Sequence, residues 1–596
     1  MNYYRVDPIL LAALDDYGGR EDRAGPAHPA PFLGTAAARG SPRPTRAVVF
    51  IDLDDGATLG RLPTGVEVSP GGGPIRTGTA LLESIDPLSE MEGVRRIVAA
   101  RLLRPHMDIA RERVGIASWR RRSGASGRGV VIGVIDTGLE TNHPAFAAAG
   151  AGADRLLRLW DQTLPGSGVA EGGYGVELQG DLMGTSVDSV GHGTHVAGVA
   201  AGDDATYGGV APAAALVIVK SDLLDAHVAD GLRYVFRVAT ELGRPAVAVV
   251  ASGTADDAHD GTDPLSMVVD AQSGPGRIVC CSAGNQGDDA THAQLEVALG
   301  QIVTVACPVR VPSAVEAQTT ARITGWYAGG DELAVAVVSP TGVQSPFQPV
   351  ATDGPPAHWY QLPDGDVRVI TPGPDPANGD HRFLVEVTPS VAAAAMPTPA
   401  AWALRLRGDR ITSGRLDLWS IDAGMAQLAG EPVRNSVKVD SPGAASRAVT
   451  VGSFTTKVEW ANLVGHDHQA GFSLDDVSSF TSPGPRRDGA PKPDLVAPGA
   501  MVAAALSARS PFHVQCLVDN FNVLQAGTSV AAAFVAGLVA LLLETRPSLT
   551  PEEVKALLRA RCRVPGQAPG SFDPVWGYGL IDAGGLADDL APATGS

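Results

Sequence analysis

Apolar runs without polar alternation dominate one long stretch of the chain. Four of them begin at Val130, Ala215, Ala246 and Arg277. A run of this kind is typical of a parallel strand that is buried on both faces. Between the second and third runs, residues 223–242 have the spacing of an amphipathic helix. Strands that alternate with helices predict a parallel sheet with crossover helices, in which catalytic groups collect beyond the carboxyl ends of the strands.

A different pattern follows this stretch. Short segments of alternating apolar and polar residues are separated by turns rich in Gly, Pro and Asp. They cover residues 321–327, 332–338, 381–387 and 402–407. Regularly spaced short strands predict an antiparallel β-sandwich. The sandwich interrupts the parallel pattern, which resumes near residue 448.

The sequence pattern of the N-terminal part predicts a smaller unit that contains both strands and a helix. Residues 47–53 and 94–103 have the pattern of strands, and residues 79–85 have that of a short helix. The fold class expected for the whole chain is therefore α/β, with a small α+β unit before the main sheet and a sandwich inserted into it. The expected organisation is an N-terminal extension (1–45), the α+β unit (46–105), the first part of the α/β domain (106–287), the inserted sandwich (288–436) and the second part of the α/β domain (437–596).

The net charge argues against binding to nucleic acids or anionic membranes. The formal net charge is −19, from 46 basic and 65 acidic residues. Nucleic acids and anionic membrane surfaces favour proteins with concentrated Lys and Arg, so neither is an expected partner. The densest basic run, Arg120 to Arg122, is interpreted as a solvated face or linker.

Cysteine content and hydropathy bear on the compartment. The five cysteines have no framework spacing, which argues against a disulfide-stapled secreted protein. A secretory signal has a basic segment followed by an apolar one, and residues 1–7 do not show this pattern. No stretch approaches 18 uninterrupted apolar residues, so no membrane insertion is expected. These observations predict a cytoplasmic protein, with export by another route left open.

Three glycine-flanked segments carry candidate catalytic groups. The first contains Asp136, the second His192 and His195, and the third Ser529. A hydroxyl nucleophile needs a base within hydrogen-bond reach, and the base needs an acidic group that fixes its tautomer. Glycines beside such groups allow tight turns and the close approach of a substrate backbone.

Each segment alone has other interpretations. Asp-Thr-Gly also occurs in aspartic proteases, and two histidines three positions apart are open to metal binding. Ser529 alone would be taken for a helix N-cap. The order Asp, His, Ser in one chain, each in a glycine-rich segment, favours a catalytic triad over these alternatives.

In this order the segments Asp-Thr-Gly, Gly-His-Gly-Thr-His-Val-Ala-Gly and Gly-Thr-Ser resemble the motifs of the subtilase family of serine proteases. The resemblance covers residues 128–287 and 437–585 and implies a subtilisin-like sheet flanked by helices. It further implies that Asp136 orients the imidazole, that His192 is general base and acid, and that Ser529 attacks the scissile carbonyl.

The same resemblance extends to the groups that bind substrate. In this family the loop that here reads Ser-Ala-Gly-Asn-Gln-Gly supplies an Asn amide to the oxyanion, which implies that role for Asn285. The strand 246–254 departs from the common family pattern, so the substrate preference stays open. The residues expected to bind substrate are Ser252, Gly253, Thr254, Ala283 and Gly284.

The resemblance also assigns roles to the two smaller parts. Residues 46–105 resemble a subtilase prodomain, which acts as an intramolecular inhibitor by placing its tail in the cleft. Self-cleavage is then expected near residues 102–106. Because Pro105 is unfavourable next to a scissile bond, the cut is also open to lying a few residues away or to not occurring. The inserted sandwich is similar in position to the jelly-roll module of germination-type bacterial subtilases, which tend to keep their prodomain bound.

The expected function is a serine endopeptidase that cleaves protein or peptide substrates through an acyl-enzyme, in limited processing. No metal and no cofactor are expected, because Asp203 and Asp204 lie in a loop that is short for the family's calcium loop. One alternative is a catalytically silent binding or regulatory protein with a retained prodomain. Another is an esterase or transpeptidase that uses the same acyl-enzyme chemistry.

Overall fold

The computed structural model describes residues 2–8, 10–11, 14, 46–54, 56–70, 73–99, 104–105, 114–147, 155–310, 320–351, 354–390 and 401–586. Its contacts divide the chain into two compact units. The β-rich unit comprises residues 1–68, 72–101 and 289–435. The α/β unit comprises residues 69–71, 102–288 and 436–596. Each unit is described by itself.

The α/β unit is built on one large sheet, which has 11 strands among the described residues. Seven strands run parallel, in the order β25-β22-β12-β10-β6-β9-β7, and shorter antiparallel strands extend both edges. The parallel strands are β6 (Val131–Asp136), β7 (Leu156–Asp161), β9 (Ala215–Lys220), β10 (Ala246–Val250), β12 (Arg277–Ser282), β22 (Val449–Thr455) and β25 (Leu495–Ala505). The strands at the edges are β8 (Val176–Leu178), β26 (Asn522–Ala526), β27 (Cys562–Arg563) and β28 (Leu580–Ile581).

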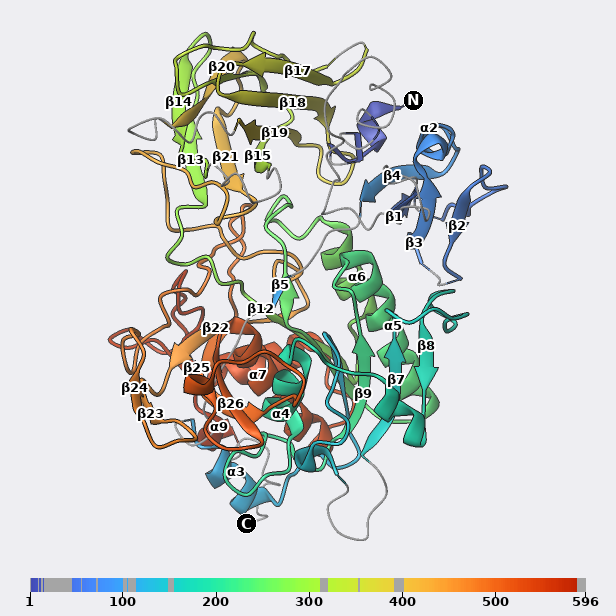
Figure 1. Cartoon of the computed structure of the whole chain (residues 1–596), viewed down its shortest axis with the longest axis vertical. Coiled ribbons are helices and arrows are strands. Elements are labelled where there is room, and N and C mark those ends of the chain that lie inside the picture. The colour runs from blue at the N-terminus through green and yellow to red at the C-terminus, as the bar shows by residue number, and fades with distance from the viewer. Residues whose placement is uncertain are drawn as a thin grey trace. The chain divides into compact units, whose positions relative to one another are not determined.

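Helices cover both faces of this sheet (Figure 1). On one face α4 (His192–Ala201) packs against α7 (Thr528–Thr545), and Ile132 and Val134 of β6 share their core. On the other face α5 (Asp225–Glu241) lies so close to the sheet that a methyl group on Gly231 would stand 3.1 Å from Ile135. α6 (Pro264–Gln272) packs beside α5. The apolar runs therefore form strands buried on both faces, as their lack of alternation predicts.

The side on which the chain adds new strands to the sheet changes at β6. The chain passes from β6 to β7 and back to β9 on one side, and then continues with β10, β12, β22 and β25 on the other side. Groups at the carboxyl ends of strands beside such a switch point face a common crevice. Asp136, the last residue of β6, stands at this point.

Helix α7 is the most apolar element of the α/β unit. Within the described part of the chain it alone is long and apolar enough to cross a membrane by length and composition. Of its most apolar window, 89% is buried inside the structure. A helix that is apolar all round is buried when it forms the centre of a large core. α7 fills this role, because it packs against β10, β12, β22 and β25.

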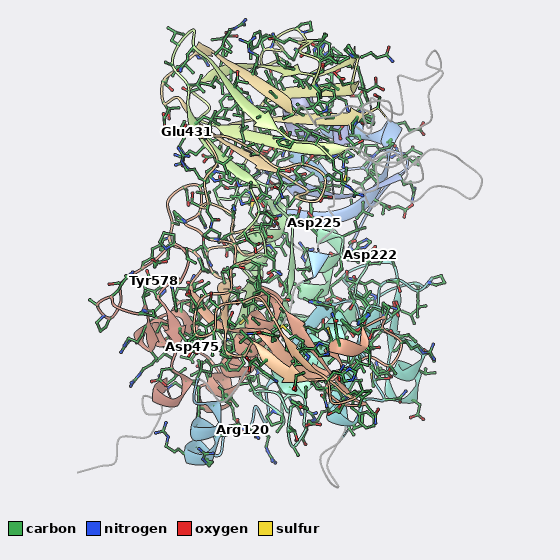
Figure 2. The ribbon with its side chains drawn as sticks, turned by 60° about the vertical axis from the view of Figure 1, so that its left-hand side comes forward. Arg120, Asp222, Asp225, Glu431, Asp475 and Tyr578 are labelled. Carbon is green, nitrogen blue, oxygen red and sulfur yellow. The ribbon has the colours of Figure 1, made fainter. Side chains whose placement is uncertain are left out.

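Shorter helices also belong to the α/β unit. α8 (Pro551–Ala560) begins with a capping box between Thr550 and Glu553, as the segment Thr-Pro-Glu-Glu predicts. α3 (Ile116–Ser123) packs on α9 (Ala583–Leu586). The basic run at 120–122 lies in α3 and is therefore helical; Figure 2 labels Arg120 on this helix.

The inserted part of the β-rich unit is a sandwich of two antiparallel sheets. The larger has the order β13-β21-β15-β19-β18-β17 and the smaller β14-β20-β16. Side chains from both sheets form one buried apolar cluster. The strands are β13 (His292–Glu296), β14 (Ile302–Cys307), β15 (Ala321–Tyr327), β16 (Glu332–Val338), β17 (Ala357–Leu362), β18 (Gly365–Pro374), β19 (His381–Pro389), β20 (Trp402–Arg410) and β21 (Arg415–Ser420).

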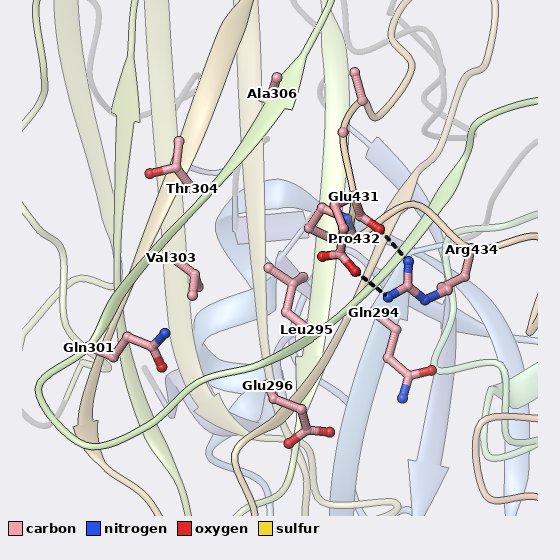
Figure 3. Close-up of a pocket in the computed structure, with 12 residues that line it drawn as sticks. Gln294, Leu295, Glu296, Gln301, Val303, Thr304, Ala306, Glu431, Pro432 and Arg434 are labelled. Carbon is pink, nitrogen blue, oxygen red and sulfur yellow. Dashed lines mark hydrogen bonds and ion pairs between the residues drawn. The ribbon is translucent and has the colours of Figure 1, made fainter.

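The sandwich contains a pocket of about 810 Å³ (Figure 3). Its walls come from β13, β14 and the segment 429–434, and an ion pair of 3.2 Å joins Arg434 to Glu431 beside it. None of the residues expected from the sequence to carry chemistry lines this pocket.

The N-terminal part of the β-rich unit is a four-stranded antiparallel sheet in the order β2-β3-β1-β4, with the short helix α2 (Ile85–Ser89). The strands are β1 (Arg46–Leu53), β2 (Val66–Val68), β3 (Ile75–Leu81) and β4 (Val94–Ala99). The prediction of a helix over residues 79–85 is wrong at its start. Residues 79–81 pair with β1 and β2, and the apolar face that they bury there outweighs their local helical spacing.

This small sheet and the sandwich share one hydrophobic core. Ile370 of β18 and Leu384 of β19 belong to the same buried cluster as the side chains of β1 and β4. Arg96 of β4 also donates to Asp375 at 2.9 Å, with both side chains buried. Burial by itself would raise the pKa of Asp375, but Arg96 and Arg382 hold it below its ordinary value.

Candidate active site

Asp136, His192 and Ser529 meet in the α/β unit. Nδ1 of His192 lies 2.6 Å from Oδ1 of Asp136, and Nε2 of His192 lies 3.3 Å from Oγ of Ser529. Each of the three residues is at most 1% exposed. The imidazole thus stands between a carboxylate and a hydroxyl, with one ring nitrogen directed at each.

Three different elements deliver these groups. Asp136 ends β6, His192 is the first residue of α4, and Ser529 lies in the first turn of α7. α4 can approach the end of β6 only because residue 193 is glycine. A methyl group there would stand 2.3 Å from the carbonyl oxygen of Gly138 and 3.1 Å from Cβ of Asp136. The glycine next to His192 therefore allows the distance of 2.6 Å between its ring and Asp136.

A second buried carboxylate, Asp188, ties these two segments together. Its Oδ1 accepts from Thr137 Oγ1 at 2.9 Å and from the backbone N–H of Gly191 at 2.8 Å. Its Oδ2 accepts from the N–H and the hydroxyl of Thr194. Asp188 thus fixes the residue after Asp136 and the first turn of α4 at once. Sequence reasoning missed this residue, because it lies three positions before the N-cap Gly191 and therefore outside the usual capping position.

His195 lies inside α4. Its Nε2 lies 3.3 Å from the carbonyl oxygen of Val502, and burial lowers its pKa to about 3. A fully buried imidazole of this kind is neutral at physiological pH. Among the described residues, no group of three or more His, Cys, Asp or Glu side chains is arranged to hold a metal ion. Asp204 instead accepts from the backbone N–H groups of Thr206 and Tyr207.

Asn285 is held in one orientation beside Ser529. Its Oδ1 accepts from the backbone N–H of Thr528 at 3.0 Å and from the Thr528 hydroxyl at 2.9 Å. The Thr528 hydroxyl in turn accepts from the N–H of Gly284 at 3.1 Å. With the carbonyl end of the amide fixed, its NH₂ group is left to donate elsewhere. The N–H groups in the first turn of α7 have no partner within the helix, so the same region carries further donors and the positive end of the helix dipole.

The residues expected to bind substrate lie around this group. β11 (Ser252–Gly253) follows β10, and it pairs antiparallel with β5 (Arg104–Pro105). An extended peptide that adds to a sheet edge is a recurrent mode of peptide recognition. The main chain of Thr254 pairs instead with Ser441, through hydrogen bonds of 3.0 and 3.2 Å. Residues 102, 103 and 106, at which self-cleavage is expected, lie outside the described residues.

The substitution Asn285→Ala is expected to lower kcat about 10²- to 10³-fold and to leave KM nearly unchanged. The amide would donate to an oxygen that becomes negative only as the reaction proceeds, so its loss affects the transition state more than substrate binding. Steady-state kinetics on a peptide substrate measures the two constants separately.

Thr528 provides the matched control for this prediction. Thr528→Ser keeps the hydroxyl that orients Asn285 and should retain activity, whereas Thr528→Val removes it and should lower kcat in the same direction as Asn285→Ala. A rise in KM with kcat unchanged would assign Asn285 to ground-state binding instead.

Comparisons with known proteins identify the family. A family model described as "Subtilase family" matches residues 127–347 and 429–579, together more than half of the chain. A 150-residue region is 35% identical to the serine protease AprX of Bacillus subtilis, over 24% of this chain and 31% of that protein. The subtilisin-like protease SBT1.4 of Arabidopsis thaliana is 26% identical over 72% of this chain and 57% of its own length. These matches span about a third to somewhat over half of the relatives' own lengths.

A solved structure shows the same fold. The CspB protease of Clostridium perfringens superposes with a TM-score of 0.64, over 80% of this chain and 97% of that one, at 21% sequence identity. The parallel sheet with its switch point at β6, the helices α4 and α7 on one face, and the match to the family model all lead to one assignment. The chain belongs to the subtilase family.

Proposed function

We propose that this protein is a serine endopeptidase that hydrolyses peptide bonds through an acyl-enzyme at Ser529. The observation that carries the proposal is the continuous line of contacts from Asp136 through His192 to Ser529, at distances of 2.6 and 3.3 Å. Nucleophile, base and orienting acid are the groups that acyl transfer requires.

In the first step Ser529 Oγ attacks the scissile carbonyl carbon, and His192 Nε2 takes the hydroxyl proton. The carbonyl oxygen becomes negative and is stabilised by the NH₂ group of Asn285 and by the N-terminus of α7. Asp136 stabilises the imidazolium through Nδ1. His192 then gives its proton to the leaving amine, which yields the acyl-enzyme.

Water completes the reaction by the same route. His192 accepts a proton from the water that attacks the acyl carbon, and it returns that proton to Ser529 Oγ when the ester bond breaks. The products are a carboxylic acid and the restored enzyme. Apart from the substrate and water, each step uses only groups present in this chain.

The proposal includes residues 46–105 as an intramolecular inhibitor, which would fit limited processing better than general degradation. The pairing of Arg104 and Pro105 with Ser252 and Gly253 supports this role, because those backbone groups would otherwise be open to substrate. The same pairing favours the second candidate function, a silent binding protein whose tail never leaves the site.

A fluorophosphonate probe tests the proposed function. It should add once to the wild-type protein, with the adduct on the peptide that contains Ser529, as intact and peptide mass spectrometry would detect. Because β5 lies along β11, the protein is also tested with a cleavable site for a sequence-specific endopeptidase inserted after Pro105. No adduct even after that cut and removal of the N-terminal fragment would overturn the proposal and favour the silent binding protein.

A cut near residues 102–106 is expected to leave the N-terminal fragment bound to the rest of the chain. The reason is the core that the fragment shares with Ile370 and Leu384, together with the buried pair of Arg96 and Asp375. The two polypeptides should therefore co-elute in gel filtration at neutral pH. Leu384→Ala, which opens a cavity in the shared core at a cost of about 2–5 kcal/mol, should promote release.

Acid should weaken the same association. The folded-state pKa of Asp375 is depressed, so its stabilising effect is present above the ordinary carboxyl pKa of about 3.9 and is lost as the pH falls below it. A fragment that elutes alone already at neutral pH would contradict the prediction that the two polypeptides stay associated after the cut.

A further inference from the structure

A buried carboxyl group that the proposed mechanism does not use lies beside two of the expected substrate-binding residues. Asp440 is 3% exposed. A methyl group on Gly253 would stand 2.5 Å from its Oδ1, and one on Gly284 would stand 2.9 Å from its Oδ2. The carboxyl group therefore lies between the strand β11 and the segment that leads into Asn285, and only glycine leaves room for it on both sides.

This carboxyl group lacks a full set of partners. Oδ1 of Asp440 accepts no hydrogen bond, and no Lys, Arg or His within the described residues forms an ion pair with it. Burial raises the pKa of Asp440 well above its ordinary value, and the nearby Asp257 and Asp263 raise it further. Native proteins pair the great majority of their buried polar atoms, so an unpaired carboxylate oxygen needs an explanation.

The two neighbouring acids differ from Asp440 because each accepts hydrogen bonds from the chain, although Oδ2 of Asp263 is also without one. Oδ2 of Asp257 accepts from the backbone N–H of Ser441 at 3.0 Å. Oδ1 of Asp263 accepts from the Ser441 hydroxyl at 2.6 Å and from the N–H of Ser266 at 2.9 Å. They hold the residue next to Asp440 in place and add negative charge around it.

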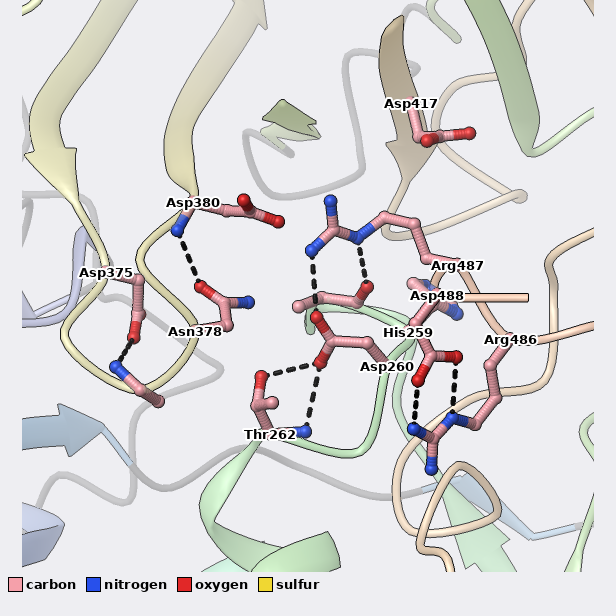
Figure 4. A network of polar contacts seen from close by, with 12 residues as sticks. His259, Asp260, Thr262, Asp375, Asn378, Asp380, Asp417, Arg486, Arg487 and Asp488 are labelled. Carbon is pink, nitrogen blue, oxygen red and sulfur yellow. Dashed lines mark hydrogen bonds and ion pairs between the residues drawn. The ribbon is translucent and has the colours of Figure 1, made fainter. Parts of the chain in front are cut away.

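Cations that contact the segments around this cluster are directed at other groups. Figure 4 shows Arg487 paired with Asp260, at 2.8 Å, and it also donates to the carbonyl oxygen of Ala258. Arg486 pairs with Asp488 in the same view. Lys438, two positions before Asp440, donates to the carbonyl oxygen of Gln286 at 2.9 Å. Two further acids thus lie near Asp440, and none of the cations in the described residues forms an ion pair with it.

The geometry of the proposed reaction places a substrate side chain at this point. The carbonyl under attack must lie between Ser529 and the NH₂ group of Asn285, with the preceding backbone along β11. The side chain of the residue on the N-terminal side of the scissile bond, the P1 residue, then enters between β11 and the segment 283–285. Asp440 lies between these same two segments.

We propose that Asp440 selects substrates whose P1 residue is arginine or lysine. This inference rests on the proposed function, because it concerns the same site. A cationic side chain supplies the missing counter-charge and donates to the unpaired Oδ1. A neutral side chain of the same size would supply no counter-charge to the buried carboxylate, and a site built to bind a charged group rejects analogues that lack the charge.

Two peptide substrates that differ only at P1 test the inference. One carries arginine and the other citrulline, which has nearly the same size and shape but no charge. The measurement is kcat/KM for the protein that has been cut behind Pro105 and freed of the N-terminal fragment. The wild type should prefer arginine at least about 100-fold. Asp440→Asn should reduce this preference to less than about 10-fold, chiefly by lowering kcat/KM for the arginine peptide.

The controls separate this inference from the proposed function. Asp181→Asn makes the same charge change at an exposed position of the α/β unit and should keep the preference of the wild type. Equal cleavage of both peptides by a wild type that takes the fluorophosphonate label would overturn the inference and leave the proposed function standing. A wild type that takes no label would overturn both. The ratio in the wild type decides the question even if Asp440→Asn does not fold.

Discussion

Ser529→Ala is expected to lower kcat by about 10⁶-fold and to abolish fluorophosphonate labelling. Ser529 supplies the only protein atom that bonds to the carbonyl carbon of the substrate in the proposed mechanism, and its Oγ lies 3.3 Å from the base. Residual turnover would come from the oxyanion site and substrate binding alone. Single-turnover kinetics on a peptide, with intact mass as a second readout, measures the loss. The variant should also retain the bond near residues 102–106 if that bond is cut by the protein itself.

Ser339→Ala is the matched control for this variant. Ser339 is a buried serine of the sandwich, and its hydroxyl contacts that of Thr341 at 3.0 Å. Its loss should leave kcat and labelling unchanged. Activity of Ser529→Ala within about tenfold of the wild type would show that another group is the nucleophile.

Asp136→Asn is expected to lower kcat by about 10⁴-fold with little change in KM. The amide has nearly the shape of the carboxylate, but its NH₂ group can donate to Nδ1 of His192. Nε2 then carries the proton and cannot accept the one from Ser529. The carboxylate also stabilises the imidazolium, and a neutral amide does not.

Steady-state kinetics across pH tests this second prediction, with Asp181→Asn as a variant of equal charge change on the surface. Thermal unfolding of both variants shows whether the fold is retained. A loss expressed in KM with kcat intact would contradict the role of Asp136 as the group that orients the base.

Much of the α/β unit was predictable because its signals are local. The four apolar runs form β6, β9, β10 and β12. A strand with apolar side chains on both faces is stable only in a sheet that is covered on both faces. The order of the motifs around Asp136, His192 and Ser529 predicted that these groups belong together, because each motif fixes its own turn or helix start. The capping box at Thr550 is local in the same sense.

Other features depended on contacts between distant segments, and no local pattern encodes those. Residues 79–81 form a strand because β1 and β2 lie on either side of them. The core that Ile370 and Leu384 share with the N-terminal sheet joins two parts that the sequence presents as separate. Each of these outcomes comes from apolar surface that only the folded chain brings together.

The site divides in the same way. The sequence by itself singled out Asp136, His192, Ser529 and Asn285 as candidates, since their chemistry shows in residue type and spacing. Only the tertiary structure decided the roles of Asp188 and Asp440, which resemble any other Asp in a turn. Burial makes the difference, because a carboxyl group removed from water must be satisfied by whatever the fold or a ligand places beside it. Asp188 finds its donors in the chain, whereas Oδ1 of Asp440 is left for a partner from outside.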